Sequence, residues 1–217
     1  MGDPAGIGPE IIVKAWQATR ESGPSFLVVG DMDLLASAPD GSGAILRRIA
    51  SPQEASDVFR DALPVLDLPL QAPVIAGRPS PASAQTVIRW IETGAGLALS
   101  GAVSGLVTAP IAKAPLYEAG FPFPGHTEYL GELTRSPAAP VSQGPVMMLA
   151  APGLRTALVT IHEPLATVSG LLTIDRIVTV GEITAAALKR DFGIVHPRLA
   201  VAGLNPHAGE AGALGRE

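Results

Sequence analysis

The hydrophobic positions near the start of the chain recur with the spacing of an amphipathic helix. Pro9 and Glu10 suit the first turn, because proline is tolerated at the first helical position and glutamate complements the positive end of the helix dipole. The positions that follow at helical spacing are Ile12, Ala15, Trp16 and Thr19. Gly23 and Pro24 end the pattern. The sequence therefore predicts a helix from residue 9 to about residue 20.

Apolar runs of strand length alternate with helical patterns in the first half of the chain. The run 26–30 ends in glycine, which is typical of a buried strand that leads into a loop. Weaker strand signals lie at 45–49 and 63–66, and an amphipathic helix over 82–99 precedes another strand signal at 105–108. This alternation predicts an α/β fold with a sheet that is at least partly parallel.

The second half of the chain repeats the mixture of strand and helix patterns. Apolar runs at 146–150 and 156–161 are separated by the turn residues 151–153 (Ala-Pro-Gly), which predicts a hairpin. A helix over 175–189 and a strand over 199–204 are expected to follow.

Composition narrows the class of protein. Of the 217 residues, 47% are hydrophobic and 16% are charged, which excludes a disordered chain. The net charge of −5 gives no general attraction for nucleic acid or an anionic membrane. The chain has no cysteine, so disulfides, thiolate zinc sites and thiol catalysis are excluded. A metal site would have to use carboxylates and the four histidines.

Two long stretches without charge, 93–112 and 136–154, have the length of a membrane span. Glycine and serine interrupt the first and proline the second, so buried strand and loop are the better interpretation. Asp3 and Glu10 flank the start of the chain, and no signal peptide is visible. A soluble, cytoplasmic protein is expected.

Three segments carry candidate chemistry in the first 130 residues. The loop 2–10 packs three glycines and two prolines before a helix. A helix start favours an anion, but the glycines do not follow the G-x-G-x-x-G order of a dinucleotide-binding loop. A tight structural turn is therefore the stronger interpretation of this loop. Lys113 follows a predicted strand, where α/β sheets bind ligands, and is a candidate for a phosphate or carboxylate; a solvated surface lysine is the alternative. His126 and Thr127 lie together at a predicted helix start, with Thr127 as the cap and His126 projecting from the loop. They form a candidate polar binding site, and an ordinary capping segment is the alternative.

Two of the remaining histidines follow predicted strands. His162 comes directly after the strand 156–161, and His207 comes soon after the strand 199–204. Side chains just past strand ends can converge on one site, and a neutral imidazole is the commonest metal ligand. The alternative is that two isolated histidines coincide by chance. His196 lies before Pro197 at a strand start and is interpreted as structural.

Five segments together resemble one enzyme family: GDPAGIGPE, VTAPIAK, FPGHTEYL, VTIHEPL and LNPHAGE. They are similar, in order and spacing, to the 4-hydroxythreonine-4-phosphate dehydrogenase (PdxA) family of vitamin B6 biosynthesis. The first also resembles a segment of isocitrate and isopropylmalate dehydrogenases, whose two-domain α/β fold this family shares. The resemblance implies a first α/β domain over 1–118 and a second, with substrate and metal residues, over 119–217. The Pro/Gly-rich stretch 110–125 is the candidate boundary.

The resemblance also implies a reaction and a set of site residues. An enzyme of this family uses NAD or NADP to oxidise and decarboxylate 4-hydroxythreonine-4-phosphate to 3-amino-2-oxopropyl phosphate, in the pathway to pyridoxal phosphate. His126 and Thr127 would bind substrate, and Lys113 is an additional candidate donor. His162 and His207 would be two of three histidines that bind a divalent cation (zinc, cobalt or magnesium). A homodimer with the active site at its interface is implied, and no catalytic or cofactor-binding residue is assigned.

The same resemblance leaves alternatives open. It places the first strand of the first domain before residue 1, and the third metal histidine and further substrate contacts beyond residue 217, so the chain is expected to be incomplete at both ends. An inactive fragment is therefore one alternative. A paralogue acting on 4-phosphothreonate or a carboxylated dihydrodiol is another. A metal-dependent hydrolase is the least favoured, since the sequence offers no obvious carboxylate base near the histidines except Glu163 and Glu210.

Overall fold

The computed structural model describes residues 1–39, 43–135, 144–207 and 209–213. Contacts divide the chain into two compact units, Met1–Thr134 and Arg135–Glu217. The boundary expected after residue 118 thus lies inside the first unit. Among the helices of the described residues, none is long and apolar enough to cross a membrane, and residues 136–143 of the second charge-free stretch lie outside the description.

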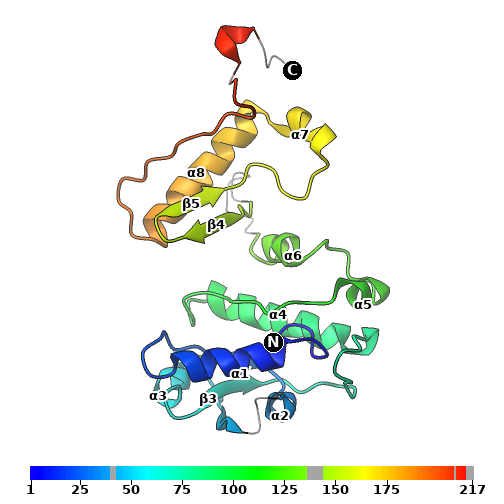
Figure 1. Ribbon diagram of the computed structural model, residues 1–217. Coiled ribbons are helices and arrows are strands. Elements are labelled where there is room, and N and C mark those ends of the chain that lie inside the picture. Colours follow the sequence, from blue (N-terminus) through cyan, green and yellow to red (C-terminus); the bar gives the residue numbers. More distant parts are fainter. Residues whose placement is uncertain (40–42, 136–143, 208, 214–217) are drawn as a thin grey trace. The chain divides into compact units, whose positions relative to one another are not determined.

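The first unit contains a three-stranded parallel sheet (Figure 1). Its strands are β1 (Val28–Gly30), β2 (Leu46–Arg48) and β3 (Leu63–Asp67), and β3 lies in the middle. Val28 pairs with Val65, and Leu46 pairs with Leu63. The parallel sheet expected from the sequence is confirmed. The crossovers carry α2 (Met32–Ser37) after β1, and η2 (Pro52–Glu54) with α3 (Ala55–Val58) after β2.

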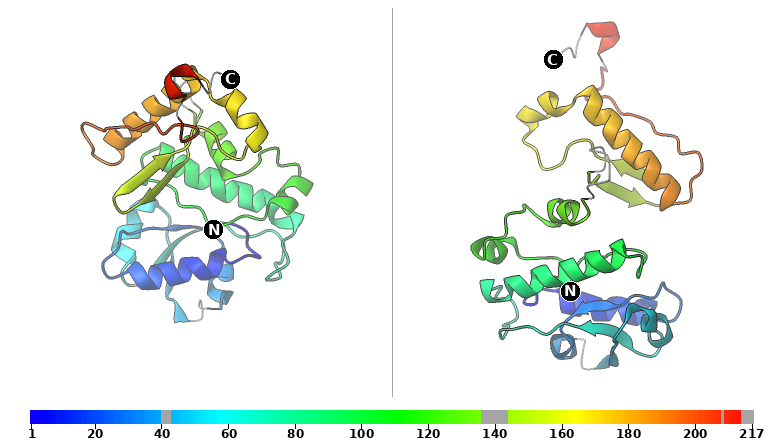
Figure 2. Two further views of the ribbon diagram at one scale, coloured as in Figure 1. Left: turned by 45° about the horizontal axis from the view of Figure 1, so that its top comes forward. Right: turned by 180° about the vertical axis from the view of Figure 1, so that it is seen from behind.

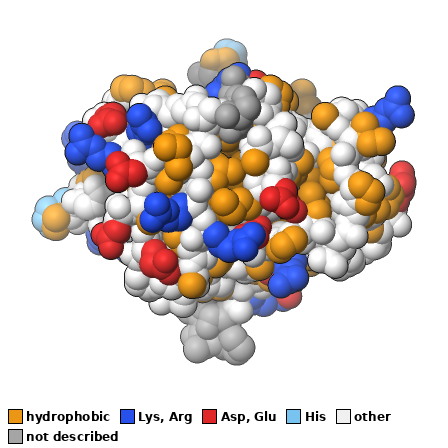
Figure 3. Space-filling view, turned by 90° about the horizontal axis from the view of Figure 1, so that it is seen from below, with side chains coloured by type: hydrophobic (Ala, Val, Ile, Leu, Met, Phe, Trp, Pro, Cys, Tyr) orange, Lys and Arg blue, Asp and Glu red, His pale blue; other side chains and the backbone are white. Residues whose placement is uncertain are grey.

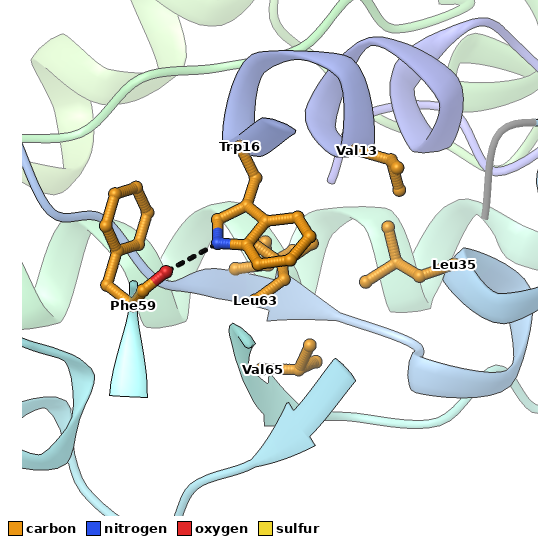
Figure 4. Close-up of a cluster of buried hydrophobic side chains, with 7 residues drawn as sticks. Val13, Trp16, Leu35, Phe59, Leu63 and Val65 are labelled. Carbon is orange, nitrogen blue, oxygen red and sulfur yellow. Dashed lines mark hydrogen bonds between the residues drawn. The ribbon is translucent and has the colours of Figure 1, made fainter. Parts of the chain in front are cut away.

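Helix α1 (Gly8–Thr19) covers this sheet and confirms the first predicted helix. It buries Val13 and Trp16 against Leu35 and side chains of β1 and β3, and Figure 4 shows this cluster. The Trp16 indole Nε1–H donates a hydrogen bond to the Phe59 carbonyl at 2.6 Å, so the buried polar end of the ring is satisfied. Trp16 is therefore the central side chain of the first core, because it is buried and its indole N–H is hydrogen-bonded.

Helix α4 (Ala84–Leu99) forms a second core, after the short η3 (Pro81–Ser83). Its buried face carries Val87, Trp90 and Ile91. These side chains pack with residues of α5 (Lys113–Glu118), of the following loop and of α6 (His126–Leu133). Residues on both sides of position 118 belong to this cluster. For this reason the boundary between the two units lies after Thr134 and not after residue 118.

The second unit contains a hairpin and a long helix (Figure 2). Strands β4 (Met148–Ala151) and β5 (Leu154–Ala157) pair antiparallel around a turn in which Gly153 has a φ of +79°. The short α7 (Leu165–Leu171) and the long α8 (Ile174–Arg190) follow, and η4 (Glu210–Gly212) lies near the end. The predicted hairpin and the predicted helix over 175–189 are confirmed.

Two predicted strands are wrong. Neither 105–108 nor 199–204 forms a strand, and Val107 and Val201 are 97% and 74% exposed. An extended apolar run becomes a strand only when a neighbour supplies hydrogen bonds to its backbone. Neither run has a partner strand among the described residues. Strand β5 also ends at Ala157, earlier than the predicted residue 161.

Candidate functional site

The His126–Thr127 pair forms the first turn of α6, which begins at His126. Gly125 occupies the capping position, and no side chain caps the helix. The predicted cap by Thr127 is therefore wrong, and His126 belongs to the helix and not to the preceding loop. The uncapped start leaves backbone N–H groups of the first turn available to an acceptor.

The His126 imidazole is held in a partly buried position. Its Nε2 atom is buried and has no hydrogen-bond partner among the described residues. Burial lowers the pKa of His126, and the positive charges of the Met1 ammonium and of Lys113 lower it further. The ring is thus neutral near pH 7, and Nε2 is a buried polar atom whose hydrogen-bonding capacity is unused among the described residues.

Lys113 lies beside the start of α6, although it is the first residue of α5. Its Nζ and Cε atoms are each 3.6 Å from the position that a Cβ on Gly125 would occupy. Lys113 is exposed, and it forms no ion pair with another described residue. The structure therefore brings together the three predicted substrate residues, namely an unpaired cation, a neutral imidazole and a hydroxyl at a helix start.

The opening loop supports this arrangement through its backbone. The Asp3 N–H donates to the Pro110 carbonyl at 2.9 Å, and the Asp3 carboxylate accepts from the Ala5 N–H at 2.8 Å. Gly2 has a φ of +83°, and a Cβ there would lie 2.6 Å from the Pro110 oxygen. Only glycine fits that position without strain. The loop 2–10 is thus a structural turn that fixes the segment leading to Lys113.

Tyr129 anchors α6 to α4, a role that the sequence reasoning missed. The Tyr129 hydroxyl donates to Glu92 Oε1 at 2.7 Å, and its ring lies 4.9 Å from Phe121 and 5.0 Å from Phe123, centroid to centroid. Burial, together with the Glu92 carboxylate, raises the pKa of Tyr129, which stays protonated. The only sequence signal was the position of Tyr129 within the FPGHTEYL segment.

His162 lies in the second unit, beyond the end of β5, and is exposed. Its φ of +56° places the backbone in the left-handed region, which is rare for residues other than glycine. The Arg176 Nε–H donates to the Val159 carbonyl at 3.0 Å and so ties the segment before His162 to the first turn of α8. The expected position of His162 directly at a strand end is wrong, because the strand stops earlier.

His207 is also exposed and follows an extended segment, not a strand. Its backbone N–H donates to Asn205 Oδ1 at 2.9 Å, and its ring Nδ1 lies 2.6 Å from Glu210 Oε1. The segment 194–207 runs back along α8 and passes the N-terminal end of that helix (Figures 1 and 2). The chain segments that lead to both histidines therefore reach the same end of α8.

His162 and His207 are donor types that a divalent cation can use, but the described residues do not gather them into one metal site. Two exposed imidazoles suit zinc or cobalt, and a histidine whose other ring nitrogen meets a carboxylate is typical of metal ligands. Within the described residues, however, no three His, Asp or Glu side chains gather at one point. The metal site is therefore a proposal that rests on the donor types.

We expect His126 to titrate below the ordinary value for a histidine side chain. The pKa of His126 is lower in the folded chain than in the unfolded chain. As the pH falls below about 6.5, the unfolded chain therefore protonates this imidazole first, and the stability that the neutral ring contributes is lost. Proton NMR of the four histidines measures the midpoints, with His126→Gln to assign the resonance. A midpoint for His126 at or above the ordinary value would contradict the buried position of the ring.

Comparison with known proteins identifies the family. The family described as "Pyridoxal phosphate biosynthetic protein PdxA" matches residues 23–217. The chain belongs to the PdxA family. The 4-hydroxythreonine-4-phosphate dehydrogenase of Caulobacter vibrioides is 65% identical over all of this chain and 64% of its own length. That of Maricaulis maris is 52% identical over all of this chain and 65% of its own length. This PdxA chain thus spans about two thirds of the length of these relatives.

Solved structures agree with the family assignment. The 4-hydroxythreonine-4-phosphate dehydrogenase of Klebsiella pneumoniae matches with a TM-score of 0.84 and 37% identity, over 98% of this PdxA chain and 64% of the solved chain. A terephthalate 1,2-cis-dihydrodiol dehydrogenase from Burkholderia xenovorans matches with a TM-score of 0.62 and 24% identity, over 97% of this chain and 62% of its own, which shows a shared fold alone.

Proposed function

We propose that this chain serves the oxidation and decarboxylation of 4-hydroxythreonine-4-phosphate to 3-amino-2-oxopropyl phosphate, in pyridoxal phosphate biosynthesis. The observation that carries the proposal is 65% identity, over the whole chain, to a relative named for that dehydrogenase activity. The proposed architecture is the two-domain fold of isocitrate and isopropylmalate dehydrogenases. The proposed setting is a homodimer in the cytoplasm with no membrane or nucleic-acid partner. On the face that Figure 3 shows, acidic and basic side chains are interspersed, which fits the absence of a polyanion partner.

The residues at the start of α6 suit a small anionic substrate. The Lys113 ammonium attracts a phosphate or carboxylate, and the N–H groups of the first turn of α6 can donate hydrogen bonds to the same anion. The neutral His126 Nε2 and the Thr127 hydroxyl hydrogen-bond polar groups of the substrate. These residues bind and orient the substrate, which is the protein's part in a cofactor-dependent oxidation.

The proposed cofactors are NAD or NADP and a divalent cation (zinc, cobalt or magnesium) held by His162 and His207. NAD or NADP would supply a hydride acceptor for the secondary alcohol, and a cation held by His162 and His207 would supply positive charge to polarise oxygens of a substrate. The two exposed imidazoles supply neutral nitrogen donors, which suits zinc and cobalt better than magnesium.

Ligand binding and turnover test this function. The purified chain is titrated calorimetrically with 4-hydroxythreonine-4-phosphate, 4-phosphothreonate and a carboxylated dihydrodiol, and NAD(P) reduction is followed by absorbance with each cation. We expect binding of 4-hydroxythreonine-4-phosphate that His126→Ala abolishes and that the control His196→Ala leaves unchanged. Turnover of the dihydrodiol alone would replace the proposal with the paralogue, and binding without turnover would favour the inactive fragment. Absence of binding would overturn the substrate site.

A further inference from the structure

We infer that the two tyrosines of this chain, Tyr117 and Tyr129, are positioning residues that hold the His126–Thr127 turn in place for ligand binding. Tyr117 fixes the loop before the turn and Tyr129 fixes the helix after it, each through the hydrogen bond that its hydroxyl donates. This inference deepens the proposed function and rests on His126 binding substrate. The tyrosine pair acts through His126 and has no part of its own in the proposed substrate contacts.

The two hydroxyl groups fix the chain on both sides of His126. The Tyr117 hydroxyl donates to the carbonyl of Pro124, which precedes the turn, at 3.1 Å. The Tyr129 hydroxyl, one helical turn after His126, donates to Glu92 Oε1 at 2.7 Å. Residues three apart on a helix lie on the same face, so His126 and Tyr129 share one face of α6. Fixing Tyr129 therefore fixes the direction in which His126 points.

Helix α6 is too short to hold its position without such contacts. It has 8 residues, and isolated helices shorter than about 12–15 residues are marginal in water. Its buried residue is Tyr129, whose ring packs against Phe121 and Phe123. Aromatic packing accepts a range of ring positions, whereas a hydrogen bond requires a narrow range of distance and angle. The bond to Glu92 thus sets how α6 lies on α4.

The position of His126 has to be imposed by its surroundings. Its Nε2 atom is buried without a partner among the described residues, which costs free energy. A turn that were free to move would rotate this nitrogen towards water and remove the cost. The bonds of Tyr117 and Tyr129 oppose that rotation from either side. Burial and the Glu92 carboxylate also raise the pKa of Tyr129, so its hydroxyl keeps the proton that it donates.

The alternative is that the two bonds only add stability. Tyr117 is 48% exposed, and the Glu92 side chain is also exposed. Water therefore replaces the lost partner when either bond is removed, and the expected loss of stability is small. Stability alone does not explain why both tyrosine hydroxyls of the chain bond around one turn. Holding an unsatisfied imidazole nitrogen ready for a ligand does explain it.

Phenylalanine variants of the 217-residue chain test the inference, because they remove each hydroxyl and keep each ring. Tyr129→Phe and Tyr117→Phe are expected to raise the NMR titration midpoint of His126 towards the ordinary value, since the imidazole then reaches water. The calorimetric affinity for 4-hydroxythreonine-4-phosphate should fall about 3–10-fold in each variant. Glu92→Gln keeps an acceptor oxygen and should retain both properties, whereas Glu92→Ala should behave like Tyr129→Phe.

The matched control is Thr134→Val at the other end of α6. It removes a hydroxyl that donates to the Leu130 carbonyl at 2.7 Å and should change neither the His126 midpoint nor the affinity. Circular dichroism shows which variants retain the fold. Should Tyr129→Phe fail to fold, Glu92→Ala breaks the same bond through an exposed side chain.

The outcomes separate this inference from the proposed function. If His126→Ala weakens substrate binding but the folded tyrosine variants change neither affinity nor midpoint, the positioning role is overturned while the substrate site stands. A loss of thermal stability alone in those variants has the same meaning. If His126→Ala leaves the affinity unchanged, the substrate site is overturned, and the inference with it.

Discussion

Replacing Trp16 with alanine is expected to lower the free energy of unfolding of the first unit by about 3–5 kcal/mol. Trp16 is 2% exposed and lies at the centre of the cluster between α1 and the parallel sheet (Figure 4). Truncation leaves a cavity between Val13, Leu63 and Val65, since packed side chains relax only partly into the space. It also leaves the Phe59 carbonyl without the donor that Trp16 Nε1 supplies.

Urea unfolding followed by circular dichroism measures this loss. Trp16→Phe removes the hydrogen bond but keeps much of the ring volume, so it should lower the free energy of unfolding much less than Trp16→Ala. Gln17→Ala, at an exposed position of the same helix, is the control and should change stability by no more than about 0.5 kcal/mol. An equal loss in Trp16→Ala and Gln17→Ala would show that α1 does not pack as described.

Asp31→Ala is expected to lower the free energy of unfolding by about 2–4 kcal/mol, the second largest effect. The Asp31 carboxylate is buried and uses both oxygens: Oδ1 accepts from the Leu34 N–H and caps α2, and Oδ2 accepts from the Leu70 N–H, each at 2.7 Å. Loss of an N-cap costs about 1 kcal/mol, and an unsatisfied buried donor costs about 1–3 kcal/mol more. Asp31 thus joins the end of β1 to the segment after β3.

The matched control for this prediction is Asp33→Ala. Asp33 is exposed in the first turn of the same helix and carries the same charge, so its removal costs at most about 0.5 kcal/mol by weakening the interaction with the helix dipole. Asp31→Asn keeps one acceptor oxygen and should fall between the two. Equal urea midpoints for Asp31→Ala and Asp33→Ala would contradict the double role of the Asp31 carboxylate.

The helices were predictable because their signals are local. Periodic apolar positions and end signals placed α1, α4 and α8 to within a few residues. The three parallel strands and the hairpin were also predictable, since each apolar run found a partner. The runs at 105–108 and 199–204 have the same local pattern but no partner among the described strands, and no local pattern reports that difference.

The candidate site divides in the same way. The residue types and the five segments suggested Lys113, His126 and Thr127 as ligand-binding residues, and His162 and His207 as metal ligands. We expected His162 and His207 to lie at the ends of strands, and this expectation was wrong for both residues. The sequence also gave no sign that Tyr129 binds Glu92 or that Glu210 meets the His207 ring, because each contact depends on how the backbone turns.

The sequence by itself determined the family, the three longest helices (α1, α4 and α8), the paired strands and the identity of the chemically useful side chains. These properties follow from residue type and from spacing along a few turns or strands. Only the tertiary structure decided that Lys113 lies beside the start of α6, that His126 Nε2 is buried without a partner, and that Glu210 faces His207 Nδ1. Burial, pKa and hydrogen-bond direction depend on the atoms that surround a group in space, and those atoms come from residues that folding brings together.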